Sequence, residues 1–394
     1  MTFRLNAVLW ILVLTSYLLP SYSSRLGERE LPRLSADAIR TLVTTPDPVK
    51  NIDPNNAQSH LTKILIPRAP GTENNTFVRN YIISTMKNLK WHVDLDEFDG
   101  DTPAGPRHFV NVIATKDPEA SRRVILSAHF DSKYFPTAPD NQFVGATDSA
   151  APCAMMLDLA EALDPLLDDR KQRMDNGFVE DEEVADTTLQ LIFFDGEEAF
   201  AVWTDTDSIY GARHLAETWA TTYVQPNQKR KLVSAETYLS GIEHLILLDL
   251  LGAPDPSIRS FFLDTAWLFD ALKSSEQRLG DSGAFTYGDS QSMAKENWKT
   301  WLRPRTNNVV NYGFIGDDHV PFLKRGVDIL HLIAEPFPRV WHKLSDNADA
   351  LDIPTMRRWN LMLRVFMAEY LHLQPPSSNK ERDSHTIKRI ESEL

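Results

Sequence analysis

The chain has 394 residues, of which 42% are hydrophobic and 24% are charged, as in an ordinary globular protein. Its formal net charge is −14. That balance argues against a nucleic-acid partner, because phosphate binding needs clustered Lys and Arg and the sequence has no basic patch. Cys153 is the only cysteine, so no intramolecular disulfide is possible and stability must come from a large core.

Residues 1–24 have the pattern of a signal peptide and are excluded from the predicted fold. Met1–Arg4 supplies a short positive start, and Leu5–Leu19 is largely apolar. An uncleaved membrane anchor is the alternative, although the apolar stretch is short for a span. Asn74 begins the only Asn-x-Ser/Thr sequon and is a candidate glycosylation site. We therefore expect a secreted protein, with Golgi membrane anchoring as the alternative.

Periodicity in the rest of the chain predicts alternating helices and strands. In the first half we expect, in order, helices over Ser35–Val43 and Phe77–Leu89, strands over Trp91–Phe98, Phe109–Thr115 and Arg123–His129, a helix over Ala150–Leu166 and a strand over Thr188–Phe194. In the second half we expect a helix over Ser208–Ala220, a strand over His244–Leu250, a helix over Phe261–Leu279, a strand over Asp328–Ile333 and a helix over Thr355–Leu373.

Strands that are apolar throughout and separated by helices imply a mostly parallel sheet covered on both faces. The leading strands, two of them joined by a polar turn, are close enough to form a hairpin. The predicted fold class is therefore α/β, a single globular domain over 35–373 with a central mixed, mostly parallel sheet flanked by helices on both faces. Asp168–Asp186 is acidic and is interpreted as a solvated loop. The polar tail, 375–394, is expected to be disordered.

Four short segments carry residues suited to one metal-centred site. They are Ala128–Lys133, Gly145–Ala150, Phe194–Glu198 and Val340–His342. Each follows an apolar run or precedes a helix, and loops at the carboxyl ends of parallel strands converge on one crevice. The sequence therefore predicts that these segments meet.

Zinc favours His nitrogen and carboxylate oxygen, and a catalytic site keeps a position open beyond three protein ligands. Asp148, Glu198 and His342 supply such a set. Taken singly, they also fit as a helix N-cap, a helix-start carboxylate and a surface histidine. Two adjacent carboxylates after a buried strand are costly unless a cation is near, which favours the metal site.

The carboxylate next to Glu198 suggests divided labour, in which Glu197 moves protons while its neighbour binds metal. Asp249, at the end of an apolar strand, and Asp317 are further acidic groups for the same cleft. A turn or helix-cap role is the alternative for Asp249.

Six segments of the chain together resemble animal-type glutaminyl-peptide cyclotransferases. They are His129–Phe135, Phe143–Ala150, Phe193–Phe200, Leu247–Pro254, Asp317–Phe322 and Pro336–His342. The resemblance runs from about Ser35 to Leu373. The parent superfamily comprises zinc aminopeptidases of the same α/β fold, which bind two zinc ions.

The resemblance implies one zinc ion per chain and a role for each matching residue. The implied ligands are Asp148, Glu198 and His342, and the implied general acid/base is Glu197. Asp249 and Asp317 are implied to belong to the hydrogen-bond network of the cleft, with His129 and His331 nearby. The implied aromatic pocket consists of Trp203, Phe337 and Trp341, beside Ile315. Two departures stand out. Gly316 stands where we expect Gln in vertebrate members of this family. The disulfide that some members carry is absent, since Cys153 has no partner.

The resemblance further implies cyclisation of N-terminal Gln to pyroglutamate with release of ammonia. The expected substrates are peptides or proteins that begin with Gln, with N-terminal Glu a poorer fit, and the expected state is a monomer. A two-zinc aminopeptidase, with His129 and Asp249 as further ligands, is the main rival. An inactive secreted binding domain is another, against which the complete ligand set argues.

Overall fold

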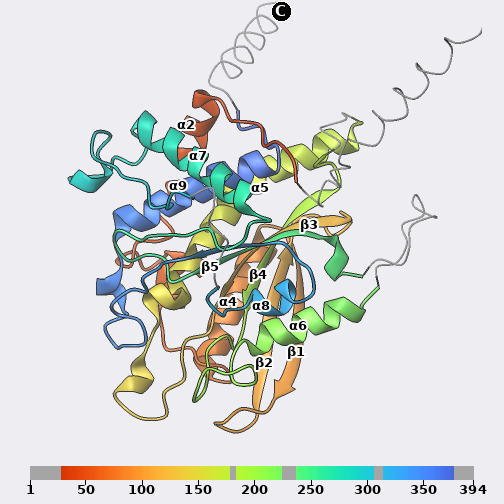
Figure 1. The fold of residues 1–394 in the computed structure, drawn as a ribbon, viewed down its shortest axis with the longest axis vertical. Helices are drawn as coiled ribbons and strands as arrows, with labels where there is room; N and C mark the ends of the chain where they lie inside the picture. Colours follow the sequence, from red (N-terminus) through yellow and green to blue (C-terminus); the bar gives the residue numbers. More distant parts are fainter. Residues whose placement is uncertain (1–27, 178–182, 224–236, 306–313, 377–394) are drawn as a thin grey trace, which may run out of the picture. The chain divides into compact units, whose positions relative to one another are not determined.

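The computed structural model describes residues 28–177, 183–223, 237–305 and 314–376 (Figure 1). The elements below belong to the compact unit that begins at Leu31. The predicted signal peptide and all but two residues of the predicted tail lie outside the described residues. Within the described ranges, no helix is both long and apolar enough to cross a bilayer.

A six-stranded sheet organises the fold, in the order β1-β2-β4-β3-β5-β6. The strands are β1 His92–Gly100, β2 Arg107–Thr115, β3 Arg122–His129, β4 Thr187–Phe194, β5 Ile242–Asp249 and β6 Ile329–Ile333. β1 pairs with β2, and β2 with β4, in antiparallel fashion, whereas β4, β3, β5 and β6 run parallel. The mixed, mostly parallel sheet predicted from the sequence is confirmed.

The strand neighbours differ in one place from the sequence expectation. β2 and β3, which the polar turn joins, do not pair, because β4 lies between them. Every residue of β4 is buried, so an edge position would expose an apolar strand, and the centre of the sheet is its stable place. The hairpin is formed by β1 and β2 instead.

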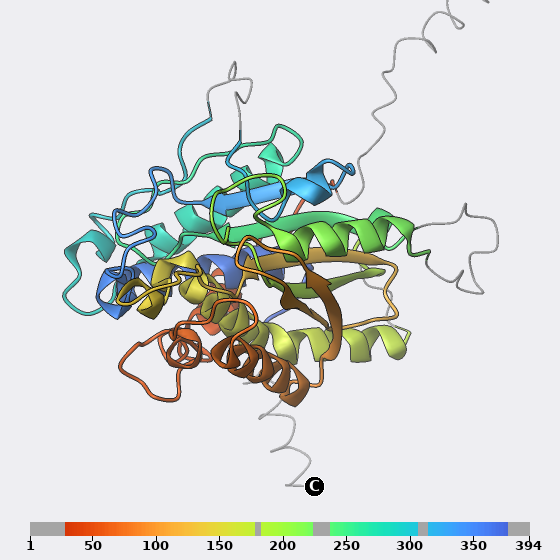
Figure 2. The same cartoon turned by 90° about the horizontal axis from the view of Figure 1, so that it is seen from below.

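Helices cover both faces of the sheet. They are α2 Ala36–Thr44, α3 His60–Ile64, α4 Glu73–Asn88, α5 Ala151–Asp175, α6 Tyr210–Thr221, α7 Ala266–Ser282, α8 Val320–Leu323 and α9 Ile353–Tyr370. Figure 2 shows α6 on one side of the sheet and α4 and α5 on the other. Along β3 and β4, alternate residues join different cores: Leu126 and Leu191 face α4, α5 and α9, whereas Ile125 and Ile192 face α6.

The expected loop from Asp168 is wrong for its first part, because α5 continues to Asp175. Tertiary contacts explain the extension. The guanidinium of Arg170 is buried and donates to the carbonyls of Thr187 and Val184. Lys116 lies 2.6 Å from the carboxylate of Asp168, so this acidic residue is paired rather than merely solvated.

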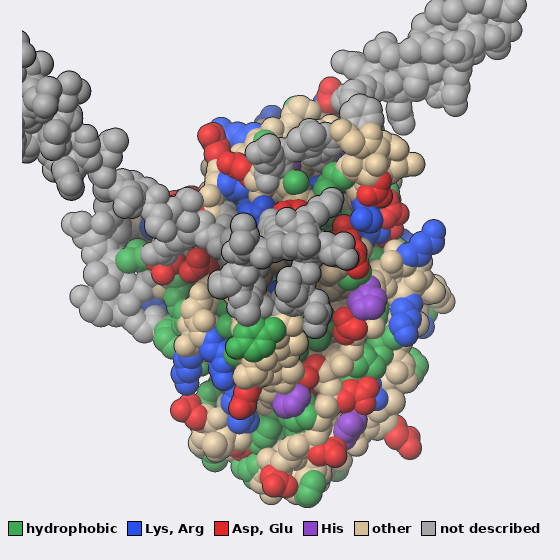
Figure 3. All heavy atoms as spheres, turned by 90° about the vertical axis from the view of Figure 1, so that its right-hand side faces the viewer, with side chains coloured by type: hydrophobic (Ala, Val, Ile, Leu, Met, Phe, Trp, Pro, Cys, Tyr) green, Lys and Arg blue, Asp and Glu red, His purple; other side chains and the backbone are tan. Residues whose placement is uncertain are grey.

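The edge strand β1 is exposed and acidic, with the sequence His-Val-Asp-Leu-Asp-Glu-Phe-Asp-Gly. Charged side chains on an edge strand oppose pairing with another chain. Acidic and basic side chains are interspersed over the face drawn in Figure 3.

Candidate active site

A cleft of about 500 Å³ opens at the carboxyl ends of the parallel strands. Polar and apolar residues line it: Lys133, Asp148, Glu197, Glu198, Ala199, Ala201, Val202, Trp203, Asp249, Leu250, Ile315, Gly316, Ile333, Phe337, Trp341 and His342. The carboxylates come from the turn before α5, the segment after β4 and the last residue of β5. The convergence expected from the strand pattern is therefore observed.

Asp148, Glu198 and His342 present one ligand atom each, and the three atoms lie within 4.8 Å of one another. Nε2 of His342 is 3.2 Å from Oε2 of Glu198 and 3.5 Å from Oδ2 of Asp148. Oδ2 of Asp148 and Oε1 of Glu198 are buried without a hydrogen-bond partner. Buried carboxylate oxygens without partners fit a cation, and one nitrogen with two carboxylates is a donor set that suits zinc.

A second group shares Asp148. His129, Asp148 and Asp249 also bring ligand atoms within 4.8 Å of one another. Nε2 of His129 lies 3.0 Å from Asp148 and 3.5 Å from Asp249, although it has no partner in hydrogen-bond geometry. Oδ1 of Asp249 is already occupied, since it accepts from Ser149 Oγ and from the Leu250 amide.

Asp346 joins the loops that carry two of the candidate ligands. Its backbone carbonyl accepts from the Ala146 amide at 3.0 Å, and its Oδ1 accepts from the Thr147 amide at 2.9 Å. Gly145 is required just before this turn, because its φ is 51° and a Cβ there would lie 2.0 Å from the Asp148 carbonyl oxygen. Asp148 is thereby held against the His342 loop.

His342 itself has a strained backbone, with φ at 54°. A non-glycine residue in this region costs of order 1–3 kcal/mol and persists only where the surroundings enforce it. Such strain concentrates at functional sites. The ring of Trp341 stacks on the His342 imidazole, with centroids 3.9 Å apart and planes 23° apart.

The two adjacent glutamates have opposite pKa shifts. Burial raises the pKa of Glu197 well above its ordinary value, and nearby Asp317 and Glu198 raise it further against the opposing His129. Burial also acts to raise the pKa of Glu198, but His342 and Lys133 outweigh it and hold this pKa at about 2. A pair of carboxylates pushed apart in this way suits one proton carrier and one permanent anion.

Asp131 orients both glutamates, although it was not among the predicted site residues. Its two oxygens accept from the backbone amides of Glu197 and Glu198, at 3.2 and 3.4 Å. Oδ1 also lies 3.3 Å from Nδ1 of His129. Its position two residues after β3 was the available signal, since polar residues at that edge converge on the site.

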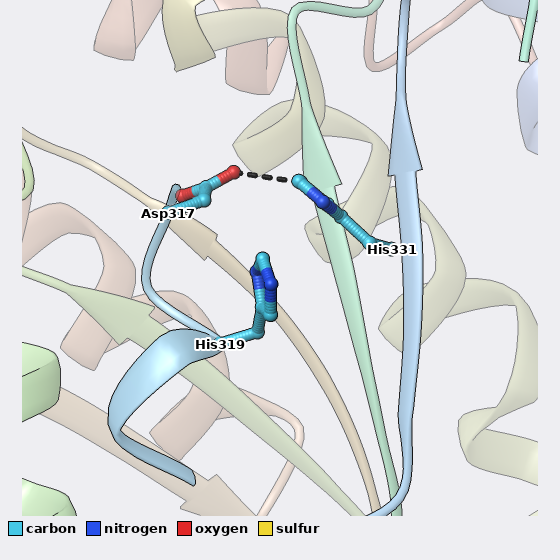
Figure 4. Close-up of side chains that lie close together, drawn as sticks. All are labelled: Asp317, His319 and His331. Atoms are coloured by element: carbon cyan, nitrogen blue, oxygen red, sulfur yellow. Dashed lines mark hydrogen bonds and ion pairs between the residues drawn. The ribbon is translucent and has the colours of Figure 1, made fainter. Parts of the chain in front are cut away.

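A third cluster lies deeper, where His331 of β6 meets the segment that enters α8 (Figure 4). Nε2 of His331 is 2.8 Å from Oδ2 of Asp317, and Oδ1 of Asp317 accepts from the Asp318 amide. His319 packs beside His331, with ring centroids 4.5 Å apart. Burial and His331 lower the pKa of His319 well below its ordinary value. These contacts already occupy both Asp317 oxygens, so the cluster orients Asp317.

The aromatic residues form the rim of the cleft. Trp203 is 43% exposed and Trp341 39% exposed, so neither is a core residue. Phe337 and Trp341 meet edge to face, with centroids 5.0 Å apart. Ile315 is part of the same lining.

Three predicted residues do not line the cleft. His129, His331 and Asp317 are each 1% exposed and lie among the buried polar residues outside its lining. Lys133, by contrast, lines the cleft and lies 3.2 Å from Glu198, although it was not among the predicted site residues. Asn74 is exposed in the first turn of α4, and its amide donates to the Pro67 carbonyl.

The chain is similar to known proteins over most of its length. Residues 111–367 match the model of peptidase family M28. A structure titled as a Zn-dependent exopeptidase from Parabacteroides distasonis has a TM-score of 0.54 and 20% identity, and covers 86% of this chain and 99% of that chain. This likeness concerns the fold.

Two further proteins are more similar. Glutaminyl-peptide cyclotransferase of Bos taurus is 44% identical over 321 residues, which cover 80% of this chain and 82% of the relative. The glutaminyl cyclase of Macrostomum lignano has 36% identity and a TM-score of 0.72, and covers 89% of this chain and 97% of that one. The chain therefore belongs to peptidase family M28 and, within it, to the glutaminyl-peptide cyclotransferases, which are acyltransferases.

Proposed function

We propose that this enzyme converts N-terminal glutaminyl residues of peptides and proteins to pyroglutamate, with one zinc ion held by Asp148, Glu198 and His342. The observation that carries the proposal is the contrast between two adjacent glutamates in a cleft with an aromatic rim. Glu197 has a raised pKa, whereas Glu198, one of the three proposed ligands, has a lowered pKa. Bound zinc would supply a Lewis acid for the oxygen of the substrate's side-chain amide.

The bond changes balance without a further reactant. The α-amine of the substrate attacks its own side-chain amide carbon, the new ring C–N bond forms, and the bond to the amide nitrogen breaks. Glu197 accepts a proton from the attacking amine and returns it to the leaving nitrogen, which departs as ammonia. The attack is intramolecular, so the substrate itself supplies much of the proximity that the reaction needs.

The cleft residues orient the substrate and limit water. Trp203, Phe337 and Trp341 surround the space in which a Gln side chain must fold back towards its amine. An apolar rim favours a closely packed substrate over a water molecule, which would hydrolyse rather than cyclise. Asp249 accepts a hydrogen bond from the Ser149 hydroxyl and lies 3.5 Å from His129, and its carboxylate is one of the polar groups that line the cleft.

A two-zinc aminopeptidase is the second candidate, because His129, Asp148 and Asp249 form a second ligand group. The cyclase is favoured since the relatives that cover most of this chain carry that name. Gln-initiated peptides are the proposed substrates, with N-terminal Glu a poorer one. We further propose a monomer on the secretory route, secreted or anchored in the Golgi, with Asn74 glycosylated.

One assay separates these candidates. Purified enzyme is incubated with a Gln-initiated peptide, and ammonia release and peptide mass are followed together. Cyclisation gives one ammonia per peptide and a mass loss of ammonia alone. Release of free N-terminal amino acid without ammonia would identify the aminopeptidase instead.

A further inference from the structure

Asp207 is a buried carboxylate on an otherwise exposed loop. The residues from Ala201 to Thr206 are exposed, whereas Asp207 is only 6% exposed. Oδ1 accepts from the Phe200 amide at 2.9 Å and from the Tyr210 hydroxyl at 2.8 Å. Oδ2 accepts from the amides of Ala201 and Val202, at 2.9 and 3.0 Å. One side chain therefore ties three consecutive backbone amides.

The residue that follows these amides is Trp203, on the rim of the cleft. Its side chain is 43% exposed, and none of the ring contacts found among the described residues involves its indole. An ideal Cβ on Gly316 would lie 3.5 Å from its Nε1 atom, in ordinary van der Waals contact, so glycine at this position leaves room for about a methyl group beside the ring. The position of the indole is therefore set through its backbone, and that backbone is held by Asp207.

The same segment is bound to the strand end that carries the catalytic glutamate. The Ile209 amide donates to the Glu197 carbonyl at 2.8 Å, and the Tyr210 amide donates to the Gly196 carbonyl at 2.7 Å. Ile209 has φ at 44°, a conformation that a β-branched residue adopts only where neighbouring contacts impose it. The segment that contains Asp207 is thus bonded to the backbone of Glu197 through Ile209, two residues further along the chain.

The charge of Asp207 suits this role. Burial acts to raise its pKa, but the hydrogen bonds from Phe200, Val202, Ala201 and Tyr210 outweigh burial and leave the pKa below its ordinary value. The ionised carboxylate only accepts hydrogen bonds, and all four of its partners donate. Such charge-assisted bonds are stronger than those between neutral groups.

We propose that Asp207 is a positioning residue, whose carboxylate holds the Phe200–Val202 backbone so that Trp203 stands ready to bind the side chain of an N-terminal Gln. This inference rests on the proposed function. According to this proposal, the loop that contains Trp203 is already ordered before the substrate arrives, so the substrate does not have to order it on binding.

The test compares Asp207→Asn with Asp205→Asn. Both remove one negative charge from the same loop, but Asp205 is exposed and only Asp207→Asn places an NH₂ group against backbone donors. With a Gln-initiated peptide, Asp207→Asn should raise KM roughly tenfold, with kcat changed less and zinc content unchanged. Asp205→Asn should retain the wild-type values.

A double-mutant cycle with Trp203→Ala tests the route of the effect. If Asp207 acts through Trp203, Asp207→Asn should add little to the KM of the Trp203→Ala enzyme. Acrylamide quenching, measured as the difference between each enzyme and its Trp203→Phe partner, should show a more accessible Trp203 after Asp207→Asn. Fully additive KM effects, or wild-type KM and quenching, would overturn the proposal.

If Asp207→Asn does not fold, Asp207→Glu still tests the proposal. Asp207→Glu keeps the charge and shifts it by one methylene, so it should fold and give an intermediate KM and intermediate quenching. Wild-type values for that folded variant would also contradict the proposal. If wild-type enzyme releases no ammonia from any Gln-peptide, the proposed function fails instead.

Discussion

The indole of Trp341 stacks on the imidazole of His342, with ring centroids 3.9 Å apart. The contact joins the aromatic rim of the cleft to its candidate metal group, because His342 also lies 3.2 Å from Glu198. Substrate binding and metal binding therefore meet at adjacent residues.

The first prediction concerns the metal. Purified enzyme should contain one equivalent of zinc, and His342→Ala should lower both zinc content and activity, because it removes the only nitrogen of the ligand group. His92→Ala is the matched control, since His92 is about half exposed on the edge strand β1. Elemental analysis is the measurement. Two equivalents of zinc, both needed for activity, would favour the aminopeptidase.

The second prediction concerns the adjacent glutamates. Glu197→Gln should keep zinc while kcat/KM falls by roughly 10²–10⁴-fold, as expected for loss of a general acid/base. Glu198→Gln should instead lose zinc, because Glu198 is the permanently ionised member of the pair. Loss of zinc from Glu197→Gln would show that the two roles are reversed.

The third prediction concerns pH. The attacking amine must be unprotonated, and an α-amino group titrates at about 7.7–8.0. The fraction of substrate in the reactive form therefore increases with pH, so kcat/KM should rise through this range before levelling. A pH series with one Gln-peptide is the measurement. A maximum near pH 5 would contradict attack by the substrate's amine.

The fourth prediction concerns the aromatic rim. Trp203→Ala and Trp341→Ala should stay folded and zinc-loaded, because both indoles are well exposed. Their KM for Gln-peptides should rise, and a low level of free N-terminal residues is expected if water enters. Circular dichroism, zinc analysis and product mass check these points. Wild-type kinetics in both folded variants would contradict the role of Trp203 and Trp341 in substrate binding.

The fifth prediction concerns Gly316. Its φ lies outside the left-handed region and a Cβ would make only ordinary contact with Trp203, so side chains are tolerated there. Gly316→Gln should lower the KM for Gln-peptides several-fold by adding a polar group able to hydrogen-bond substrate. Gly316→Ala, which adds volume alone, should change little. A higher KM in Gly316→Gln would show that the open space itself is what the substrate uses.

Much of the fold was predictable because its signals are local. The apolar runs of β4 and β5 and the periodicity of α9 depend on residues a few positions apart, and all three elements are found within a few residues of the expected bounds. The extension of α5 was not predictable from its acidic stretch. It depends on contacts of α5 with distant segments: Arg170 donates to the Thr187 carbonyl of β4, and Asp168 pairs with Lys116, which directly follows β2.

The sequence by itself determined which side chains were available for chemistry: Asp148, the Glu197–Glu198 pair and His342, each after a strand or before a helix. Only the tertiary structure decided that β4 lies between β2 and β3, that Asp317 and His331 are buried outside the cleft lining, and that Asp131 and Asp207 hold the backbone of the site. The difference in pKa between two adjacent glutamates is likewise tertiary, since Lys133, His342 and Asp317 produce it from distant segments. Secondary structure follows from neighbours in the chain, whereas burial and charge depend on which segments folding brings together.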